Sequence, residues 1–412
     1  MTSRSRSWLP TSMDSLRVLR HRNYAIFIAG NLVALTGQWM QRIALAWLIW
    51  ELTQSTLWLG LLSAADLLPA TLIGLVGGVI ADRVNRYGLV MSCYAATTVV
   101  AVMFGVLQLT GNLNPVAILI LAFIQGVTSA LSHPARLAIV QSLVPAQDSG
   151  KAVTVGAITI NMARLIGPAI GGWLILYFGI GWVFFLCAFM QAVFIVCFMI
   201  VPDPQQKMAP GSSSSILGEI KEGISHLWTI AMMPQVLLFL LMSGIMLRSM
   251  VELVPAFAAR SFAVSAVGVA IMSSTMAAGA VLGGLTFSPG RDPLQLTPKI
   301  MVCWMFSALA VCCLALSTIH LAAVLSVSVL GFFMTRGMII TQTYIQLTVL
   351  DRMRGRAVSI FALLSRGSPL FGALLIGAIA DSIGLEIPVL GSGLIMLFAS
   401  FFAWRRTKAK TS

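Results

Sequence analysis

Charged side chains lie inside long apolar stretches of this sequence, where a charge is costly and therefore informative. Eight residues are placed in this way: Arg42, Asp66, Arg136, Arg164, Arg248, Glu252, Arg336 and Arg366. A charge at the centre of an isolated membrane helix costs at least about 2.5 to 3.5 kcal/mol. We therefore expect these side chains to face one another or a wet interior rather than lipid.

Two pairs of these charges are predicted from their spacing. Arg42 and Asp66 fall at a similar depth in successive apolar stretches, because an α-helix rises about 1.5 Å per residue. Arg248 and Glu252 are four residues apart, on one face of a helix, and are expected to neutralise each other.

Acids at this depth can also carry protons. Burial favours the neutral acid, whereas a neighbouring arginine favours the carboxylate, so movement between the two environments would switch the proton. Asp66 and Glu252 are therefore candidates for proton coupling, with a permanent structural ion pair as the alternative for each. His133 and His320 are further candidates.

Arginines without an acid nearby in the sequence indicate what is bound. Guanidinium groups bind carboxylate-like oxygens through two parallel hydrogen bonds. We predict a site for an anionic or strongly polar organic substrate, lined by Arg42, Arg136, Arg164, Arg336 and Arg366. The alternative is that these arginines bond helix-end carbonyls or extend to the membrane interface, above all Arg136.

The elements that carry these residues are predicted to be membrane helices. Of 412 residues, 58% are hydrophobic and 9% charged, whereas a soluble domain carries about a quarter charged residues. The apolar runs lack period-two alternation, which favours helices over a barrel. We predict twelve spans, near 24–50, 56–80, 88–109, 115–143, 152–177, 181–201, 234–258, 264–287, 299–317, 320–347, 357–381 and 387–404.

One long joint, Pro202 to Ser215, divides the spans into two sets of six. We predict a bundle of residues 1–201, a cytoplasmic linker of 202–230 with a short surface helix, and a second bundle of 231–412. A shift of 205 residues lays 141–153 over 346–358 and Gly126 over Gly331. Two halves of like orientation imply a pseudo-two-fold axis along the membrane normal, with the substrate between them near mid-membrane.

Positive charges are distributed unevenly over the joints. Lysines and arginines gather before the first span, in the even-numbered joints and in the tail, whereas only Arg260 lies on the other side. The formal net charge of +13 is thus a topology signal rather than a nucleic-acid-binding face. We expect a multi-pass protein of the inner (cytoplasmic) membrane with both termini in the cytoplasm.

Several absences are also expected. The first span is too long for a cleaved signal peptide, and the six cysteines lie within spans without metal-ligand spacing. We expect no cofactor, no metal and no nucleic acid, a monomer surrounded by lipid, and a small-molecule substrate. A membrane enzyme would need a nucleophile with a base or clustered acids and histidines, and a receptor would need a folded soluble domain.

Two sets of motifs resemble a known family. Between the second and third spans, Gly77-Gly78-Val-Ile-Ala-Asp82-Arg83-Val-Asn-Arg86 resembles the signature loop of the major facilitator superfamily. The segments Leu48-Ile-Trp-Glu51-Leu-Thr, Pro134-Ala-Arg136 and 163–172 are similar to the branch that holds the enterobactin exporter and macrolide efflux proteins. The resemblance covers nearly the whole chain and implies an all-α fold of twelve helices in two pseudo-symmetric six-helix bundles.

The resemblance also implies roles for single residues. In the family the loop stabilises the state closed to the cytoplasm, so Gly78, Asp82, Arg83 and Arg86 are predicted to form a cytoplasmic latch; plain topology charge is the alternative. Small residues permit close helix packing, and a stretch such as Gly167-Pro168-Ala-Ile-Gly171-Gly172 accompanies antiporters in the family. The usual family arginine before Gln125-Gly126 is Ala122 here, so its proton-relay role is not carried over.

Together these patterns predict a secondary active transporter that works by alternating access. We expect a proton-coupled exporter of a small anionic or polar organic solute such as a siderophore. A multidrug or macrolide efflux pump, an importer of an anionic solute and a lipid flippase remain alternatives.

Overall fold

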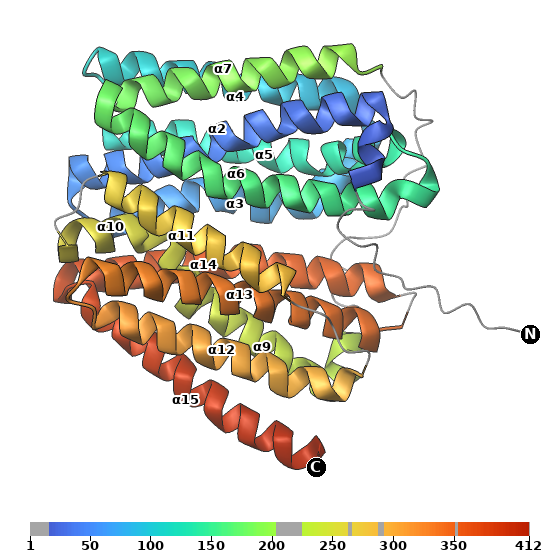
Figure 1. Cartoon of the computed structure of the whole chain (residues 1–412), viewed down its shortest axis with the longest axis vertical. Coiled ribbons are helices and arrows are strands. Elements are labelled where there is room, and N and C mark those ends of the chain that lie inside the picture. The colour runs from blue at the N-terminus through green and yellow to red at the C-terminus, as the bar shows by residue number, and fades with distance from the viewer. Residues whose placement is uncertain (1–15, 203–224, 263–265, 287–291, 351–352, 412) are drawn as a thin grey trace, which may run out of the picture.

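The computed structural model describes residues 16–202, 225–262, 266–286, 292–350 and 353–411, without the side chains of 74–83, 260–262, 294 and 409–411. The described residues form helices and no strand (Figure 1). The N-terminal helices are η1 (Leu16–Arg20), α2 (Arg22–Thr53), α3 (Thr56–Arg83), α4 (Arg86–Leu109), α5 (Pro115–Ser142), η2 (Ala146–Asp148), α6 (Ser149–Phe178) and α7 (Ile180–Ile200). The others are α9 (Met233–Ser243), η3 (Gly244–Arg248), α10 (Met250–Phe262), α11 (Ala266–Leu285), α12 (Pro293–Ala315), α13 (His320–Thr348), α14 (Arg354–Ile383) and α15 (Glu386–Thr411).

Eleven helical stretches of the described residues are long and apolar enough to cross a membrane. The remaining long helix is α2, whose 32 residues extend about 48 Å. It carries Asn31, Gln38, Gln41 and Arg42, and a membrane helix tolerates such side chains where they face the protein interior. The seventh span consists of α9, η3 and α10 in succession. The all-α prediction is thereby confirmed.

The predicted span boundaries hold to within a few residues except at two places. Helix α12 begins at Pro293 rather than near 299, because Pro298 lies inside the helix and does not end it. Helix α15 continues to Thr411 rather than ending near 404. Residues 203–224 of the predicted linker lie outside the described part of the chain, so the domain boundaries stay a prediction.

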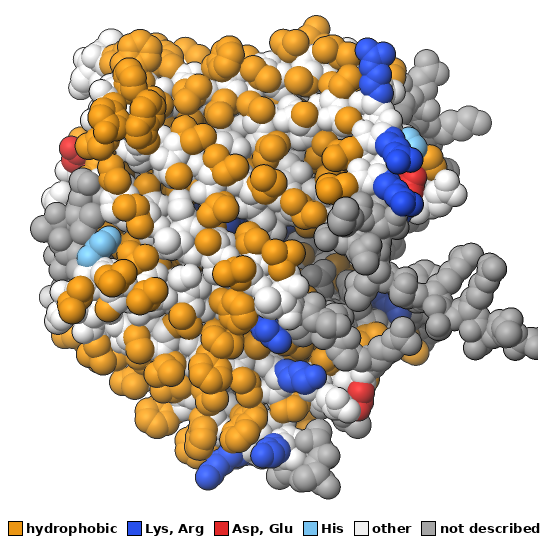
Figure 2. Space-filling view, in the orientation of Figure 1, with side chains coloured by type: hydrophobic (Ala, Val, Ile, Leu, Met, Phe, Trp, Pro, Cys, Tyr) orange, Lys and Arg blue, Asp and Glu red, His pale blue; other side chains and the backbone are white. Residues whose placement is uncertain are grey.

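The helices form two bundles whose axes run side by side (Figure 1). Helices α2 to α7 make the upper bundle of that view and α9 to α15 the lower one. Helix α2 begins and α15 ends on the right, where Lys and Arg side chains gather, while hydrophobic side chains cover the flank (Figure 2). We call this the basic end; that it faces the cytoplasm stays a prediction of the charge rule.

The sequence repeat corresponds to a structural repeat. A Cβ at Gly126 of α5 would lie 2.6 Å from the backbone oxygen of Asp66 in α3. A Cβ at Gly331 of α13 would lie 2.1 Å from the backbone oxygen of Met276 in α11. Each half therefore uses a glycine at the matching place to bring two helix backbones together.

Two seams join the halves. Helix α3 packs against α14, and α6 packs against α11, while α10 also contacts α2 and α3. Because α2 and α3 carry Arg42 and Asp66 and α10 carries Glu252, the first seam brings charged residues of both halves together.

Candidate functional site

Arg42 is the centre of a charged group that spans the two halves. Its Nη1 donates to Asp66 Oδ2 at 2.9 Å, and its Nη2 donates to Glu252 Oε1 at 2.7 Å. The second oxygen of Glu252 accepts a hydrogen bond from Ser63 Oγ at 3.2 Å. The predicted pair of Arg42 with Asp66 is confirmed, and Glu252 adds a bridge from the C-terminal half. The side chains of Arg42 and Asp66 remain 30% and 35% exposed.

The expected pair of Arg248 with Glu252 is wrong. Gly244–Arg248 is π-helical, and the Ser249 N–H bonds the Gly244 carbonyl at 3.2 Å. The regular spacing that places residues i and i+4 side by side is therefore lost. Arg248 Nη1 donates instead to the carbonyl of Ser365 in α14 at 2.7 Å, while Glu252 bonds Arg42.

Arg164 of α6 lies beside this group without a carboxylate partner among the described residues. Its Cζ lies 4.6 Å from the centre of the Trp39 ring, and Arg42 Cζ lies 5.6 Å from the same ring. Its Nε is buried and has no hydrogen-bond partner in the described structure. Arg42, Arg248 and Glu252 all lie within electrostatic reach of it. A buried guanidinium with unused donors is suited to bind an anion.

Two other predicted arginines lie in different surroundings. Arg136 Nη1 donates to Asn31 Oδ1 at 3.1 Å and to the Tyr94 hydroxyl, both in the N-terminal half. Arg336 lies in α13, with its Cζ 5.8 Å from the centre of the Phe332 ring. The contacts of Arg136 hold neighbouring helices together, whereas nothing in them points to a solute.

Arg366 makes a further contact between the halves. Its Nη2 lies 3.1 Å from His133 Nε2, which joins α14 to α5. A guanidinium is a donor only, so the imidazole must accept through Nε2 and be neutral in this contact. Arg366 also lies within electrostatic reach of Arg248, which places it near the central group.

The residues predicted to form a latch lie at the basic end of α3 and the start of α4. Gly78, Asp82 and Arg83 fall among the residues whose side chains the structure does not describe. Arg86 begins α4, and Asn85 caps this helix by accepting the Gly88 N–H at 3.0 Å. The latch therefore stays a prediction.

The predicted packing residues of α6 lie on its buried face: Gly167, Pro168, Gly171 and Gly172. A Cβ at Gly167 would lie 2.8 Å from the backbone oxygen of Thr36 in α2. A Cβ at Gly172 would lie 2.4 Å from the Cβ of Ala270 in α11, across the second seam. These glycines thus set the closeness of α6 to both neighbours and place Arg164 beside Trp39.

Some functional candidates were not singled out from the sequence. One of them is Trp39, whose ring lies near the guanidinium groups of Arg42 and Arg164. Gln41 Nε2 donates to Gln125 Oε1 at 3.1 Å, joining α2 to α5 near the same depth. Asp381 accepts a hydrogen bond from the Thr56 N–H at the start of α3. The sequence signal for such a contact was an acid in the last turn of a helix, where the helix dipole disfavours a carboxylate.

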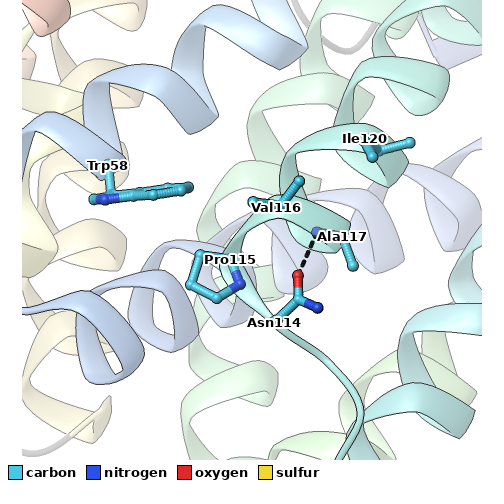
Figure 3. A pocket seen from close by; sticks show the side chains of 6 residues that line it. All are labelled: Trp58, Asn114, Pro115, Val116, Ala117 and Ile120. Atoms are coloured by element: carbon cyan, nitrogen blue, oxygen red, sulfur yellow. Dashed lines mark hydrogen bonds between the residues drawn. The ribbon is translucent and has the colours of Figure 1, made fainter.

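A pocket of about 470 Å³ lies apart from the charged group (Figure 3). It is lined by Trp58, Asn114, Pro115, Val116, Ala117 and Ile120, at the starts of α3 and α5. The amide oxygen of Asn114 is already used, because it accepts the Ala117 N–H at 2.9 Å. The pocket is therefore apolar and carries none of the predicted chemistry. Among the described residues no group of His, Cys, Asp and Glu is placed to hold a metal ion.

Comparison with curated proteins identifies transporters. The chain is 28% identical to a staphyloferrin A transporter of Staphylococcus aureus over 147 residues, which is 35% of this chain and 37% of that protein. It is 29% identical to the MFS-type transporter YfiS of Bacillus subtilis over 60% of this chain and 62% of that protein. It thus spans less than two thirds of these two relatives. The enterobactin exporter EntS of Salmonella paratyphi A matches at 22% identity over 93% of this chain and 94% of that protein.

Solved structures show the same fold. A bacterial homologue of the human lysosomal transporter Spinster, in an inward-facing and unoccupied conformation, matches with a TM-score of 0.74 at 15% identity. The match covers 94% of this chain and 97% of that one. The nucleoside transporter NupG matches with a TM-score of 0.72 at 15% identity, over 93% of this chain and 98% of that one.

The family model described as transmembrane secretion effector matches residues 13–411, nearly the whole chain. This agrees with the signature loop, with the two six-helix bundles and with the transporters among the relatives. The chain therefore belongs to the transmembrane secretion effector family of the major facilitator superfamily and is a membrane transporter rather than an enzyme.

Proposed function

We propose that this transporter exports a small anionic organic solute, such as a siderophore, by alternating access coupled to protons. The observation that carries the proposal is Arg164: a largely buried guanidinium on the face of Trp39, whose Nε has no partner among the described residues. Arg164 lies in the N-terminal half and Arg248 in the C-terminal half, within electrostatic reach of each other. An anion between them would satisfy donors from both halves.

The charge balance around Arg164 supports an anion. Four guanidinium groups, those of Arg42, Arg164, Arg248 and Arg366, accompany the two carboxylates of Asp66 and Glu252. Four positive and two negative charges leave a net +2. A cationic drug would meet this excess unfavourably, whereas a carboxylate or catecholate would reduce it.

The proton-coupling part rests on the position of Arg42 between two acids. A proton on Glu252 would remove the charge that holds one arm of Arg42 and so weaken the link between the halves. A proton on Asp66 would weaken the other arm, within the N-terminal half. Because arginine does not release its proton, a proton that moves within the group of Arg42, Asp66 and Glu252 must be carried by one of the two acids.

Export rather than import is supported by two similarities. The enterobactin exporters match over nearly the whole chain, and the Gly167-to-Gly172 stretch is similar to one that accompanies antiporters in the superfamily.

Transport by the purified protein in proteoliposomes tests the anion assignment. We expect Arg164→Ala to raise the KM for enterobactin at least about tenfold, because a hydrogen bond to a charged group contributes about 1.5 to 3 kcal/mol. The KM for an uncharged methylated analogue of the same solute should change little in this variant. Arg164→Lys keeps the positive charge but loses the planar guanidinium, so its KM for enterobactin should lie between those of Arg164→Ala and the natural protein. Equal effects on the anion and the neutral analogue would exclude charge recognition.

An imposed pH gradient tests the coupling in the same vesicles. We expect the double change Asp66→Asn and Glu252→Gln to abolish uphill transport while downhill movement of the solute continues. Undiminished coupling in this variant would remove both acids from the mechanism.

A further inference from the structure

The carboxylate of Asp381, near the end of α14, lies against the first residues of α3 in the other half. Its Oδ1 accepts the Thr56 backbone N–H at 2.7 Å and the Thr56 hydroxyl at 2.6 Å. Its Oδ2 accepts the Ser55 hydroxyl at 2.5 Å and the Leu57 N–H at 3.3 Å. One side chain thus accepts four hydrogen bonds from three successive residues.

These bonds are those of a helix N-cap supplied by another helix. The first N–H groups of a helix have no partner within it and are normally bonded by a side chain just before the helix starts. Here Thr56 and Leu57 begin α3, and the capping oxygens come from α14, more than 320 residues away in the chain. The cap therefore exists only while the two halves are in contact at this end of the molecule.

Asp381 is poorly placed with respect to its own helix. It lies in the last turn of α14, where the negative end of the helix dipole disfavours a carboxylate. The positive end of α3 compensates for this only when the helices meet. Separation of the two helices would leave Asp381 at an unfavourable site and the Thr56 and Leu57 amides without its carboxylate, while the Trp58 N–H would keep its local partner, the Ser55 hydroxyl at 3.4 Å. This contact therefore favours the closed arrangement.

The neighbouring backbone is built for the same contact. The Thr56 hydroxyl also bonds the Gly377 carbonyl at 2.7 Å, and a Cβ at Gly377 would lie 2.6 Å from the Thr56 backbone oxygen. In the sequence repeat Gly377 corresponds to Gly172, and Asp381 corresponds to Leu176. The second seam therefore has the close approach without a carboxylate at the place that corresponds to Asp381.

We propose that Asp381 is a gating residue: its carboxylate caps α3 when the halves are closed at the end opposite the basic end, and releases it when they part. The inference rests on the alternating-access part of the proposed function and is independent of the solute and of the coupling ion. Asp381 acts by positioning helices and touches no solute.

Hydrogen–deuterium exchange of the full chain in lipid nanodiscs, without any solute, tests the gate. We expect Asp381→Ala to speed exchange about tenfold at residues 55–60, since a lost N-cap frees these amides. If the cap holds the gate shut, the start of α11, on the other seam at the same end, must also exchange faster. Exchange at the basic end should slow, because in alternating access the halves close at the basic end when they open at the opposite end.

Matched variants separate a gate from a local cap. Ser382→Ala changes the next residue, whose hydroxyl bonds the Ile379 carbonyl in its own helix, and should leave exchange unchanged. Thr56→Val removes the hydroxyl donor at nearly constant volume and should speed exchange at the same residues by a smaller factor. In the double variant with Asp381→Ala, the two effects on exchange should not add. Asp381→Asn, which keeps one acceptor oxygen, should lie between alanine and the natural residue and serves if alanine fails to fold.

Faster exchange confined to residues 55–60 would show a local cap only and overturn the gate. The same result would leave the anion assignment of Arg164 untouched, because that assignment is measured by transport. Conversely, an unchanged KM in Arg164→Ala would end the anion assignment, while the exchange pattern of Asp381→Ala would stand by itself.

Discussion

The two seams between the halves are held together by different kinds of contact. Along α3, close packing of Gly60 against Ala373 is combined with contacts to carboxylates of the C-terminal half, Thr56 with Asp381 and Ser63 with Glu252. Along α6, the contact with α11 is made by small residues, with Gly172 against Ala270. Polar contacts can be exchanged for water or broken by a proton, whereas the packed contact is set by shape. Small residues thus set the spacing of both seams, whereas the carboxylate contacts that a proton could break lie on the α3 side.

Removal of Arg42 would break the polar side most severely. Arg42→Ala leaves Asp66 and Glu252 near each other without the cation that joins them. We expect unfolding free energy to fall by about 2 kcal/mol, and proton-driven transport to stop. Reversible denaturation in mixed micelles measures the first and vesicle transport the second. Arg42→Lys retains one ion pair and should recover part of the stability; full stability in Arg42→Ala would show that the bridge contributes nothing.

A side chain at Gly172 would break the packed side by a different route. In Gly172→Val the new Cβ would overlap the Cβ of Ala270, now 2.4 Å from its ideal position, so α6 and α11 must separate. Overpacking of this kind costs about 1 to 3 kcal/mol. We expect faster deuterium exchange at the start of α11. Gly156→Val on the same helix is the control, because no atom lies within 4 Å of its added Cβ; similar exchange in both variants would contradict a steric role for Gly172.

The smallest effect is expected at the polar contact of the packed seam. Ser274 Oγ donates to the Leu165 carbonyl at 3.1 Å, and Ser274→Ala removes this bond without adding volume. A single neutral hydrogen bond contributes about 0.5 to 1.5 kcal/mol, and we expect the lower end of this range here, about a twofold change in exchange at α11. If Ser274→Ala opened the end of the molecule as far as Thr56→Val, the two seams would not differ in kind.

The sequence predicts the helices well because lipid leaves a segment of this composition few alternatives. An apolar run without alternation must satisfy its own backbone, and therefore becomes a helix whose ends lie near the first polar residues. Counting residues along two neighbouring spans was also sufficient to pair Arg42 with Asp66, since depth depends only on helical rise. The start of α12 was predicted too late because Pro298 was taken as a residue before the helix, whereas it lies inside the helix near its start.

The contacts between the halves could not be predicted in this way. The partner of Glu252 depends on how α10 docks against α2, which no local pattern records, and on the irregular turn before it. The partners of Asp381 lie in another half of the chain. For the same reason the sequence could not separate the five predicted arginines by their partners: Arg136 bonds side chains within its own half, whereas Arg164 keeps its Nε unused.

The wide turn at Gly244–Arg248 has a mechanical consequence. A π turn holds one residue more than an α turn, and each residue of an α-helix advances the azimuth by about 100°. Tightening that turn would revolve α10 about its own axis while α9 stayed fixed, and would swing Glu252 away from Arg42. The seventh span thus contains an irregular turn about which α10 could rotate relative to α9, and such a rotation would separate Glu252 from Arg42 and break the salt bridge between the halves.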